Sequence, residues 1–237
     1  MRSSYDLDIA VPIHRTILIR TVALALALCT FVAHAAPLPD QVMGQKQHLA
    51  PYQAQIQARL DANHSLIRDI SQQLEEQKLP TLLALLPMLE SSFNPKAVSH
   101  ANAAGLWQLI PATAQRFGLE VSQNQDQRFD TQASTQAAIQ YLSFLHNKFD
   151  DLALALAAYN AGEGRVSRAI KQAGSTHFSA LKLPKETRQY VSRFYALLEL
   201  VEWQHLTQPQ PNTLFLFGQS TTQPLIDLTP LPPLITL

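Results

Sequence analysis

Residues 79–90 read Leu-Pro-Thr-Leu-Leu-Ala-Leu-Leu-Pro-Met-Leu-Glu, and Ser-Ser-Phe-Asn-Pro follows at 91–95. The first run is apolar on nearly every side, which is typical of a helix buried all round. Pro87 cannot donate a hydrogen bond to Leu83, so the helix should kink or restart just before Glu90. A carboxyl group among Leu, Met and Phe loses hydration in its charged form, and its pKa should rise. Glu90 is therefore a candidate general acid, although a Glu at a helix end can also simply reach solvent.

Apolar residues recur at helical spacing on both sides of this run. After a Gln-rich, proline-containing entry at 37–51, one amphipathic helix is expected through Ile56, Leu60, Ile67, Ile70 and Leu74. Residues 94–105 lack an apolar period and carry turn formers, which predicts a loop. Further helices are expected over 106–117, ended by Gly118, and over 131–149, 152–159, 165–172 and 184–203. Since no strand pattern of comparable strength occurs, the predicted fold class is all-α.

The first 35 residues are expected to form a secretory signal peptide. An apolar run at 21–33 follows Arg15 and Arg20, and Ala-His-Ala at 33–35 offers small side chains to a signal peptidase, with cleavage expected after Ala35. The run is short for a membrane span of about 20 residues. Two alternatives stay open: an uncleaved N-terminal anchor, and a lipoprotein, because Leu-Ala-Leu-Cys at 26–29 resembles a lipobox.

The composition excludes several classes of protein. The 237 residues hold 18 Lys plus Arg and 18 Asp plus Glu, and no cluster of basic residues, which argues against a nucleic-acid partner. A single cysteine, Cys29, excludes a disulfide framework and a cysteine-based zinc site. The eight histidines are scattered without a His-x-x-x-His pair, so no metal site is predicted.

Four blocks carry a family resemblance. They read Glu-Ser-Ser-Phe-Asn-Pro-Lys-Ala-Val-Ser at 90–99, Ala-Ala-Gly-Leu-Trp-Gln-Leu-Ile-Pro-Ala-Thr-Ala at 103–114, Ala-Ala-Tyr-Asn-Ala-Gly-Glu-Gly-Arg-Val at 157–166 and Leu-Pro-Lys-Glu-Thr-Arg-Gln-Tyr-Val at 183–191. In this order they resemble the soluble lytic transglycosylase family of peptidoglycan-cleaving enzymes, and Asn-Ala-Ala-Gly-Leu-Trp-Gln is most similar to the membrane-bound lytic murein transglycosylase D branch. The resemblance covers about residues 80–200. It implies a lysozyme-like, goose-type helical domain with a long substrate groove.

The resemblance also divides the chain into segments. It implies a lytic transglycosylase catalytic domain at 80–205, preceded by the signal peptide at 1–35 and a helical extension at 36–79. Residues 206–237 form a tail with six of the fifteen prolines, and this tail is expected to lie outside the core.

The same resemblance implies roles for individual residues. Glu90 matches the catalytic acid/base, and the positions matching substrate-binding residues are Ser99, Gln108, Thr113, Tyr159, Asn160 and Glu186. Structural alternatives exist: Tyr159 can be a core residue, and Glu163 and Glu186 can be carboxylates in the first turn of a helix. Trp107 and Ile110 stand where the family often has Met. Trp107 can either stack on sugar or pack internally.

Most glycosidases use two carboxyl groups, whereas these blocks offer one dominant carboxyl. The resemblance implies that Glu90 protonates the oxygen linking N-acetylmuramic acid (MurNAc) to N-acetylglucosamine (GlcNAc). Attack by the muramic 6-hydroxyl then gives a 1,6-anhydro end, favoured because the nucleophile is tethered. No cofactor or metal is implied.

Two alternatives to this activity remain, a lysozyme-like muramidase that uses water and a non-catalytic glycan-binding scaffold. We expect a monomer in the periplasm or cell envelope that acts on peptidoglycan glycan strands. Association with the membrane stays open as an alternative to a free protein.

Overall fold

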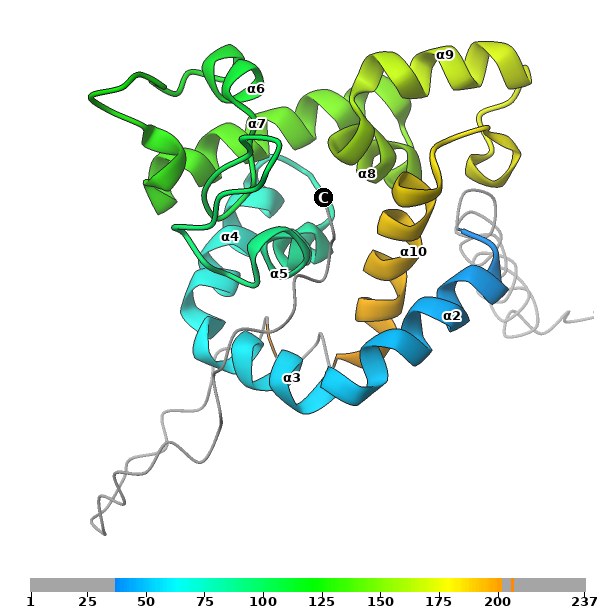
Figure 1. Cartoon of the computed structure of the whole chain (residues 1–237), viewed down its shortest axis with the longest axis horizontal. Coiled ribbons are helices and arrows are strands. Elements are labelled where there is room, and N and C mark those ends of the chain that lie inside the picture. The colour runs from blue at the N-terminus through cyan, green and yellow to red at the C-terminus, as the bar shows by residue number, and fades with distance from the viewer. Residues whose placement is uncertain (1–36, 202–205, 207–237) are drawn as a thin grey trace, which may run out of the picture.

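The computed structural model describes residues 37–201 and Leu206 (Figure 1). The predicted signal peptide and almost all of the predicted tail lie outside these residues. Within the described part the chain is helical, with isolated β-bridges and no strand. The all-α prediction is confirmed. None of the described helices has the length and apolar character needed to cross a membrane.

Nine α-helices and four short 3-10 turns make up this part of the chain. They are α2 (Pro39–Leu49), η1 (Ala50–Tyr52), α3 (Gln53–Ala62), α4 (His64–Glu76), η2 (Thr81–Leu85), α5 (Leu86–Ser91), α6 (Pro111–Arg116), η3 (Gln127–Phe129), α7 (Thr131–Phe149), α8 (Leu152–Ala161), α9 (Glu163–Ala173), η4 (Phe178–Ala180) and α10 (Lys185–Leu200). In Figure 1, α4 and α5 lie on one side of the molecule and α10 on the other, with α7 and α8 above them and α2 running beside α10.

Helix α8 lies at the centre of the core. Its sequence is almost entirely Ala and Leu, and every residue from Ala153 to Ala158 is buried. A helix that is apolar all round is stable only when other elements cover it, and α7, α9 and α10 all pack on α8. Because many of its side chains are methyl groups, these neighbours approach closely.

Aspartate caps fix where α7 and α8 begin. The side chain of Asp130 accepts a hydrogen bond from the Ala133 amide at 2.8 Å, and Asp151 accepts one from the Leu154 amide at 2.7 Å. Such caps satisfy amides that the first turn of a helix leaves free. The predicted helix over 131–149 is confirmed at both ends, and the predicted helix over 152–159 extends two residues further.

The predicted helix over 106–117 is wrong in its first half. Residues 106–109 belong to a loop in which Gln108 has a left-handed backbone (φ 47°), and α6 begins only at Pro111. Proline favours the first turn of a helix and disfavours the interior, so a helix through Pro111 is opposed by its backbone chemistry. The apolar residues Leu106 and Leu109 are buried by the packing of this loop rather than by a helix face.

The single helix expected through residues 56–74 is divided into α3 and α4. The break falls at Asn63, whose side chain donates to the carbonyl of Arg59 at 2.8 Å and so satisfies the end of α3. The apolar spacing continues across the break, which is why the pattern alone predicted one helix. Helix α2 lies in the region expected only as a Gln-rich entry, and its buried face is short: Val42, Gln45 and Leu49.

Gly105 generates the first prediction. Its φ is +81°, and a Cβ placed there would lie 1.8 Å from the backbone oxygen of Arg128. We expect Gly105→Ala to lower the free energy of unfolding by about 3 kcal/mol or more, because two backbone segments would have to separate. Denaturant unfolding followed by circular dichroism measures this loss.

Gly118 supplies the matched control for this measurement. Its φ is similar, +91°, but a Cβ there would meet nothing within 4 Å. Gly118→Ala should cost only about 1–2 kcal/mol, the strain of a left-handed alanine. Equal losses in the two variants would show that the close approach at Gly105 is unimportant.

Candidate active site

Glu90 lies in the last turn of a short helix whose start is set by proline. Helix α5 begins after η2 with Pro87 in its first turn, where the missing N–H is not needed. The predicted restart before Glu90 is confirmed. Directly after α5, Ser92 and Phe93 both have left-handed backbone conformations, with φ of 51° and 60°. This sharp turn ends the helix at Ser91, one residue after Glu90, and leads into the loop at 94–109.

A pocket of about 340 Å³ lies beside Glu90. Its walls come from α5, the loop, α6, α7, α8 and the start of α9. The lining residues are Glu90, Ala101, Ala103, Gln108, Leu109, Ile110, Thr113, Tyr141, Tyr159, Asn160, Ala161, Gly162 and Glu163. The structure thus brings together five of the seven predicted site residues: Glu90, Gln108, Thr113, Tyr159 and Asn160.

Tyr190 holds the carboxyl group of Glu90. Its hydroxyl donates to Oε1 of Glu90 at 2.5 Å, a contact between residues 100 positions apart in the chain. The Tyr190 side chain is 2% exposed, so this hydrogen bond satisfies a buried donor. Tyr190 is not among the site residues predicted from the sequence. The sequence did offer one sign that Tyr190 is buried: it lies four residues before Phe194, on the face of α10 that packs in the core.

Burial raises the pKa of Glu90 to about 8. Although the side chain keeps some exposure toward the pocket, protein atoms surround it and disfavour its charged form. The hydrogen bond from Tyr190 acts in the opposite direction and lowers the pKa, but its effect is smaller. A carboxyl group with this pKa holds its proton at neutral pH, as a general acid must.

The neighbouring tyrosines stay neutral and point their hydroxyls elsewhere. Tyr159 donates to the carbonyl of Trp107 at 2.8 Å, and Tyr141 donates to the carbonyl of Ala158 at 3.3 Å. Burial raises the pKa of both phenols well above their ordinary value. Among the described residues that line the pocket there is no Lys, Arg or His to stabilise a charged Glu90.

Glu163 is a second carboxyl group in the pocket wall, and its pKa is shifted in the direction opposite to that of Glu90. It begins α9, as expected for a carboxylate at a helix N-terminus, and pairs with Nη1 of Arg116 at 2.7 Å. This contact holds the pKa of Glu163 below its usual range. The pocket therefore contains one carboxyl that keeps its proton and one that loses it.

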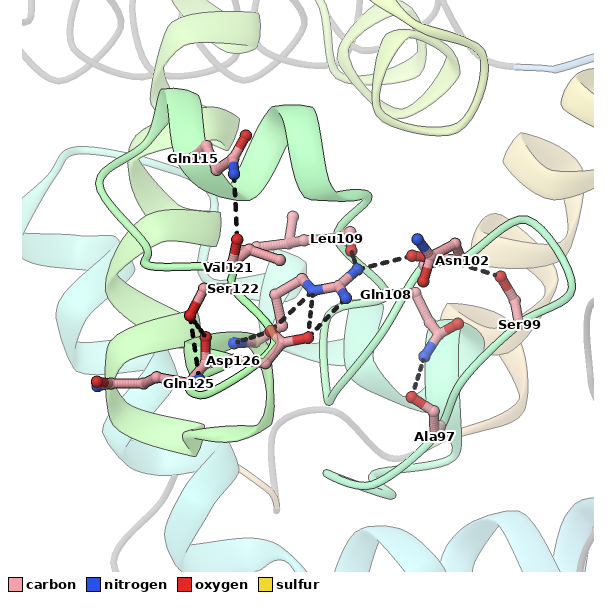
Figure 2. Close-up of polar contacts among 12 residues, drawn as sticks. Ala97, Ser99, Asn102, Gln108, Leu109, Gln115, Val121, Ser122, Gln125 and Asp126 are labelled. Atoms are coloured by element: carbon pink, nitrogen blue, oxygen red, sulfur yellow. Dashed lines mark hydrogen bonds and ion pairs between the residues drawn. The ribbon is translucent and has the colours of Figure 1, made fainter.

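A buried arginine fixes the loop that forms one wall of the pocket. Arg128, 5% exposed, pairs with Asp126 at 2.7 Å and donates to the carbonyls of Asn102 at 2.6 Å and Leu109 at 3.2 Å. Figure 2 labels these three partners. Hydrogen bonds to a charged donor are stronger than neutral ones, and the two carbonyls lie at opposite ends of the loop segment. Residues 102–109 are thereby held without a helix.

Gln108 and Thr113 line the pocket from this loop and from α6. Gln108 donates through Nε2 to the carbonyls of Ala97, a contact visible in Figure 2, and of Gly105. Its amide oxygen is the group left for a ligand. Trp107, the residue before it, is fully buried and donates to Oγ1 of Thr135 at 3.0 Å, so it packs internally rather than against the pocket.

Two predicted site residues are not among those that line the pocket. Ser99 accepts a hydrogen bond from the amide of Ala103 at 3.1 Å and shapes the loop. Glu186 is exposed in the first turn of α10. Their contacts with substrate remain predictions. Within residues 37–201, no group of three or more His, Cys, Asp or Glu is placed to hold a metal ion.

Comparison with known proteins gives a consistent family match. The protein-family model described as "Transglycosylase SLT domain" matches residues 69–182. Membrane-bound lytic murein transglycosylase D of Escherichia coli (strain K12) is 46% identical over 138 residues, which is 56% of this chain and 30% of that protein. A protein of Alteromonas sp. (strain M-1), named for tributyltin chloride resistance, is 50% identical over 99 residues, 41% of this chain and 48% of the relative.

A solved structure agrees on the fold. The 70-kDa soluble lytic transglycosylase of Escherichia coli has a TM-score of 0.50 and 24% identity, over 59% of this chain and 25% of that one. In each of these comparisons the matched segment spans less than half of the relative. The matched residues 69–182 include Glu90 and the rest of the pocket lining, whereas Tyr190 follows them. By this match residues 69–182 are a transglycosylase SLT domain, and the identities make the chain similar to the membrane-bound lytic murein transglycosylase D branch.

Proposed function

We propose that this protein is a peptidoglycan lytic transglycosylase in which Glu90 is the catalytic acid and base. Glu90 protonates the oxygen of the β-1,4 bond between MurNAc and GlcNAc, and the bond to the GlcNAc leaving group breaks. The resulting carboxylate takes the proton of the muramic 6-hydroxyl as that oxygen attacks the anomeric carbon. The products are a 1,6-anhydroMurNAc end and a free GlcNAc hydroxyl, and no water is consumed.

The observation that carries this proposal is the position of Glu90, which lies in the wall of a pocket, is surrounded by protein atoms and accepts a hydrogen bond from Tyr190. The Glu90 pKa of about 8 is above neutrality, and the pocket beside it has room for sugar. Gln108, Thr113, Tyr159 and Asn160 line this pocket, which supports their proposed contact with that sugar. Support also comes from relatives that bear the name lytic murein transglycosylase.

Glu163 favours a second candidate, a muramidase that uses water. An ionised carboxylate in the wall of the same pocket could accept the proton of a water molecule, which is the arrangement of a two-carboxylate glycosidase. Its pairing with Arg116 opposes this role because the carboxylate is already engaged and its basicity is lowered. The transglycosylase is therefore the better supported reaction.

We further propose that the protein acts on glycan strands in the cell envelope. The leader at 1–35 would direct export, residues 36–79 and 80–205 would form the helical extension and the catalytic domain, and 206–237 a separate tail. We propose that it acts as a monomer. Association with the membrane fits the name of the relatives and belongs to the same proposal.

Replacement of the catalytic carboxyl tests the reaction. Glu90→Gln should fold and release no soluble fragments from purified sacculi, at least about a thousandfold below wild type, because an amide cannot donate the proton. Glu75→Gln, at an exposed position of α4, is the control and should match wild type. Mass spectrometry of the wild-type products separates the two candidates, since a hydrolase adds a water to each new end. Hydrated ends, lost in Glu163→Gln, would establish the muramidase instead.

The pKa of Glu90 sets the expected pH dependence of the rate. The acid form is required, so activity should persist to about pH 8 and fall above it as the carboxyl ionises. A profile of kcat/KM against pH measures this limb. An alkaline limb at about pH 5, near the ordinary glutamate pKa, would contradict the burial argument.

The same pKa affects stability, with a sign that follows from linkage. The folded-state pKa of Glu90, about 8, lies above the ordinary glutamate pKa of 4.5, so the unfolded chain loses this proton first as the pH rises. The contribution to stability is complete below about pH 4.5 and is lost as the pH approaches about 8. Wild type should therefore lose up to a few kcal/mol relative to Glu90→Gln over this window, measured by urea unfolding.

Tyr190 should matter to the rate more than to the fold. Tyr190→Phe keeps the buried ring but removes the donor to Glu90, so the carboxyl loses its orientation and its pKa rises further. We expect kcat to fall about tenfold, with the alkaline limb moved upward. Tyr195→Phe, on the same helix, is the control. Unchanged kinetics in Tyr190→Phe would show that the hydrogen bond does not position the acid.

A further inference from the structure

A side chain from the N-terminal helices reaches the turn that follows Glu90. Nη1 of Arg59, in α3, donates to the carbonyl of Ser92 at 3.2 Å. Ser92 is two residues after Glu90 and is the first of the two left-handed residues that end α5. Arg59 lies outside residues 69–182, which match the family model.

This turn needs support from its surroundings. A left-handed conformation costs a residue other than glycine about 1 kcal/mol, and here two such residues are adjacent. Two backbone hydrogen bonds hold the amides, from Ser92 to Met88 and from Phe93 to Pro87. The Arg59 guanidinium holds the carbonyl side of the same turn. If the turn relaxes, the last turn of α5 relaxes with it, and that turn contains Glu90.

Arg59 occupies its place at a cost. Its Nε is buried and has no hydrogen-bond partner, and Nε2 of His64 nearby in sequence is in the same state. A buried polar atom without a partner costs about 1–3 kcal/mol, which an apolar side chain at this position would avoid. The contact with Ser92 is the interaction of the guanidinium that offsets this cost.

The same N-terminal helices are tied to α10, the helix that carries Tyr190. Helix α2 packs along α10 (Figure 1), and Nε of Arg193 donates to Oε1 of Gln45 at 2.9 Å. Lys46 pairs with Glu199 at 3.1 Å, and Gln53 donates to the carbonyl of Leu200 at 3.2 Å. Residues 39–62, which we call the N-terminal brace, therefore contact α10 at one end and the turn after Glu90 at the other.

We propose that the N-terminal brace positions Glu90 against Tyr190, and that Arg59 is the positioning residue at its α5 end. The inference rests on the proposed role of Glu90. It assigns a part in the reaction to a segment that precedes the family domain. Arg59 acts through the backbone of Ser92 and does not touch the substrate pocket.

A matched pair of variants tests the contact. Arg59→Met keeps the aliphatic stem and removes the donors, whereas Arg59→Lys keeps a charged donor on a similar stem. On soluble glycan strands we expect kcat of Arg59→Met to fall about tenfold with KM within about twofold, and Arg59→Lys to recover most of the loss. Arg68→Met, at an exposed site on α4, is the control and should match wild type.

A second readout does not depend on activity. The ¹³C carboxyl resonance of Glu90, assigned by its absence in Glu90→Gln, reports the pKa of this group directly. Tyr190 and Tyr159, from α10 and α8, are titratable groups whose charge couples to Glu90, and Tyr141 and the Glu163 carboxylate line the same pocket from α7 and α9. In Arg59→Met the pKa should fall from about 8 toward 4.5, because a displaced Glu90 loses burial, the larger influence on it. If the wild-type protein did not cleave peptidoglycan, the proposed function would be wrong. The titration would still test whether the N-terminal brace positions Glu90.

A double variant distinguishes an effect of Arg59 on the turn after Glu90 from an effect on the stability of the whole fold. Ser92→Gly accepts the left-handed conformation without strain, so adding it to Arg59→Met should restore the turn and raise kcat about threefold. The proposal is overturned if Arg59→Met keeps the wild-type kcat and Glu90 titration, or if Arg59→Lys is no better than Arg59→Met. It is also overturned if both Arg59→Met and the double variant fail to fold, because Arg59 would then support the fold and not the site.

Discussion

The hydrogen bond between Tyr190 and Glu90 constrains the whole domain. It joins α5 to α10 across 100 residues of sequence, and it forms inside the protein, where a displaced donor would be left unsatisfied. The two helices can meet in this way only if α8, between them in sequence and packed on α10, fits closely. The Ala-rich composition of α8 permits that fit, so an ordinary feature of the core serves the geometry of the site.

The electrostatic character of the pocket follows from where its donors point. A carboxylate that accepts two or three hydrogen bonds has a low pKa, whereas one in an apolar environment with a single donor keeps its proton. Tyr159 and Tyr141 both lie in the pocket wall, yet their hydroxyls are engaged by backbone carbonyls. Arg116 is engaged by Glu163. Glu90 is thus left with Tyr190, and burial determines its protonation.

The sequence predicted the parts of the fold that local chemistry determines. The helix at 131–149 has one apolar face, and the helix at 152–161 is apolar almost all round. An aspartate precedes each of them, so the apolar pattern and the caps together located both helices well. The buried environment of Glu90 could be predicted because this residue ends an apolar run. The loop at 102–109 could not, since its apolar residues are held by Arg128, a residue distant in sequence whose role appears only once Asp126, Asn102 and Leu109 surround it. Tyr190 was missed for the same reason: a buried phenol resembles a core residue until its partner is known.

The loop that replaces the expected helix has a consequence for the site. A helix through residues 106–117 would satisfy its own amides and carbonyls internally, leaving little backbone to anchor neighbouring side chains. In the loop, the carbonyls of Leu106 and Trp107 accept from Ser91 and Tyr159 instead. One of these donors follows Glu90 directly and the other lines the pocket, so the loop backbone fixes α5 relative to α8. The irregular segment therefore provides contacts that a helix would not: its carbonyls connect the end of α5, where Glu90 lies, with Tyr159 of α8.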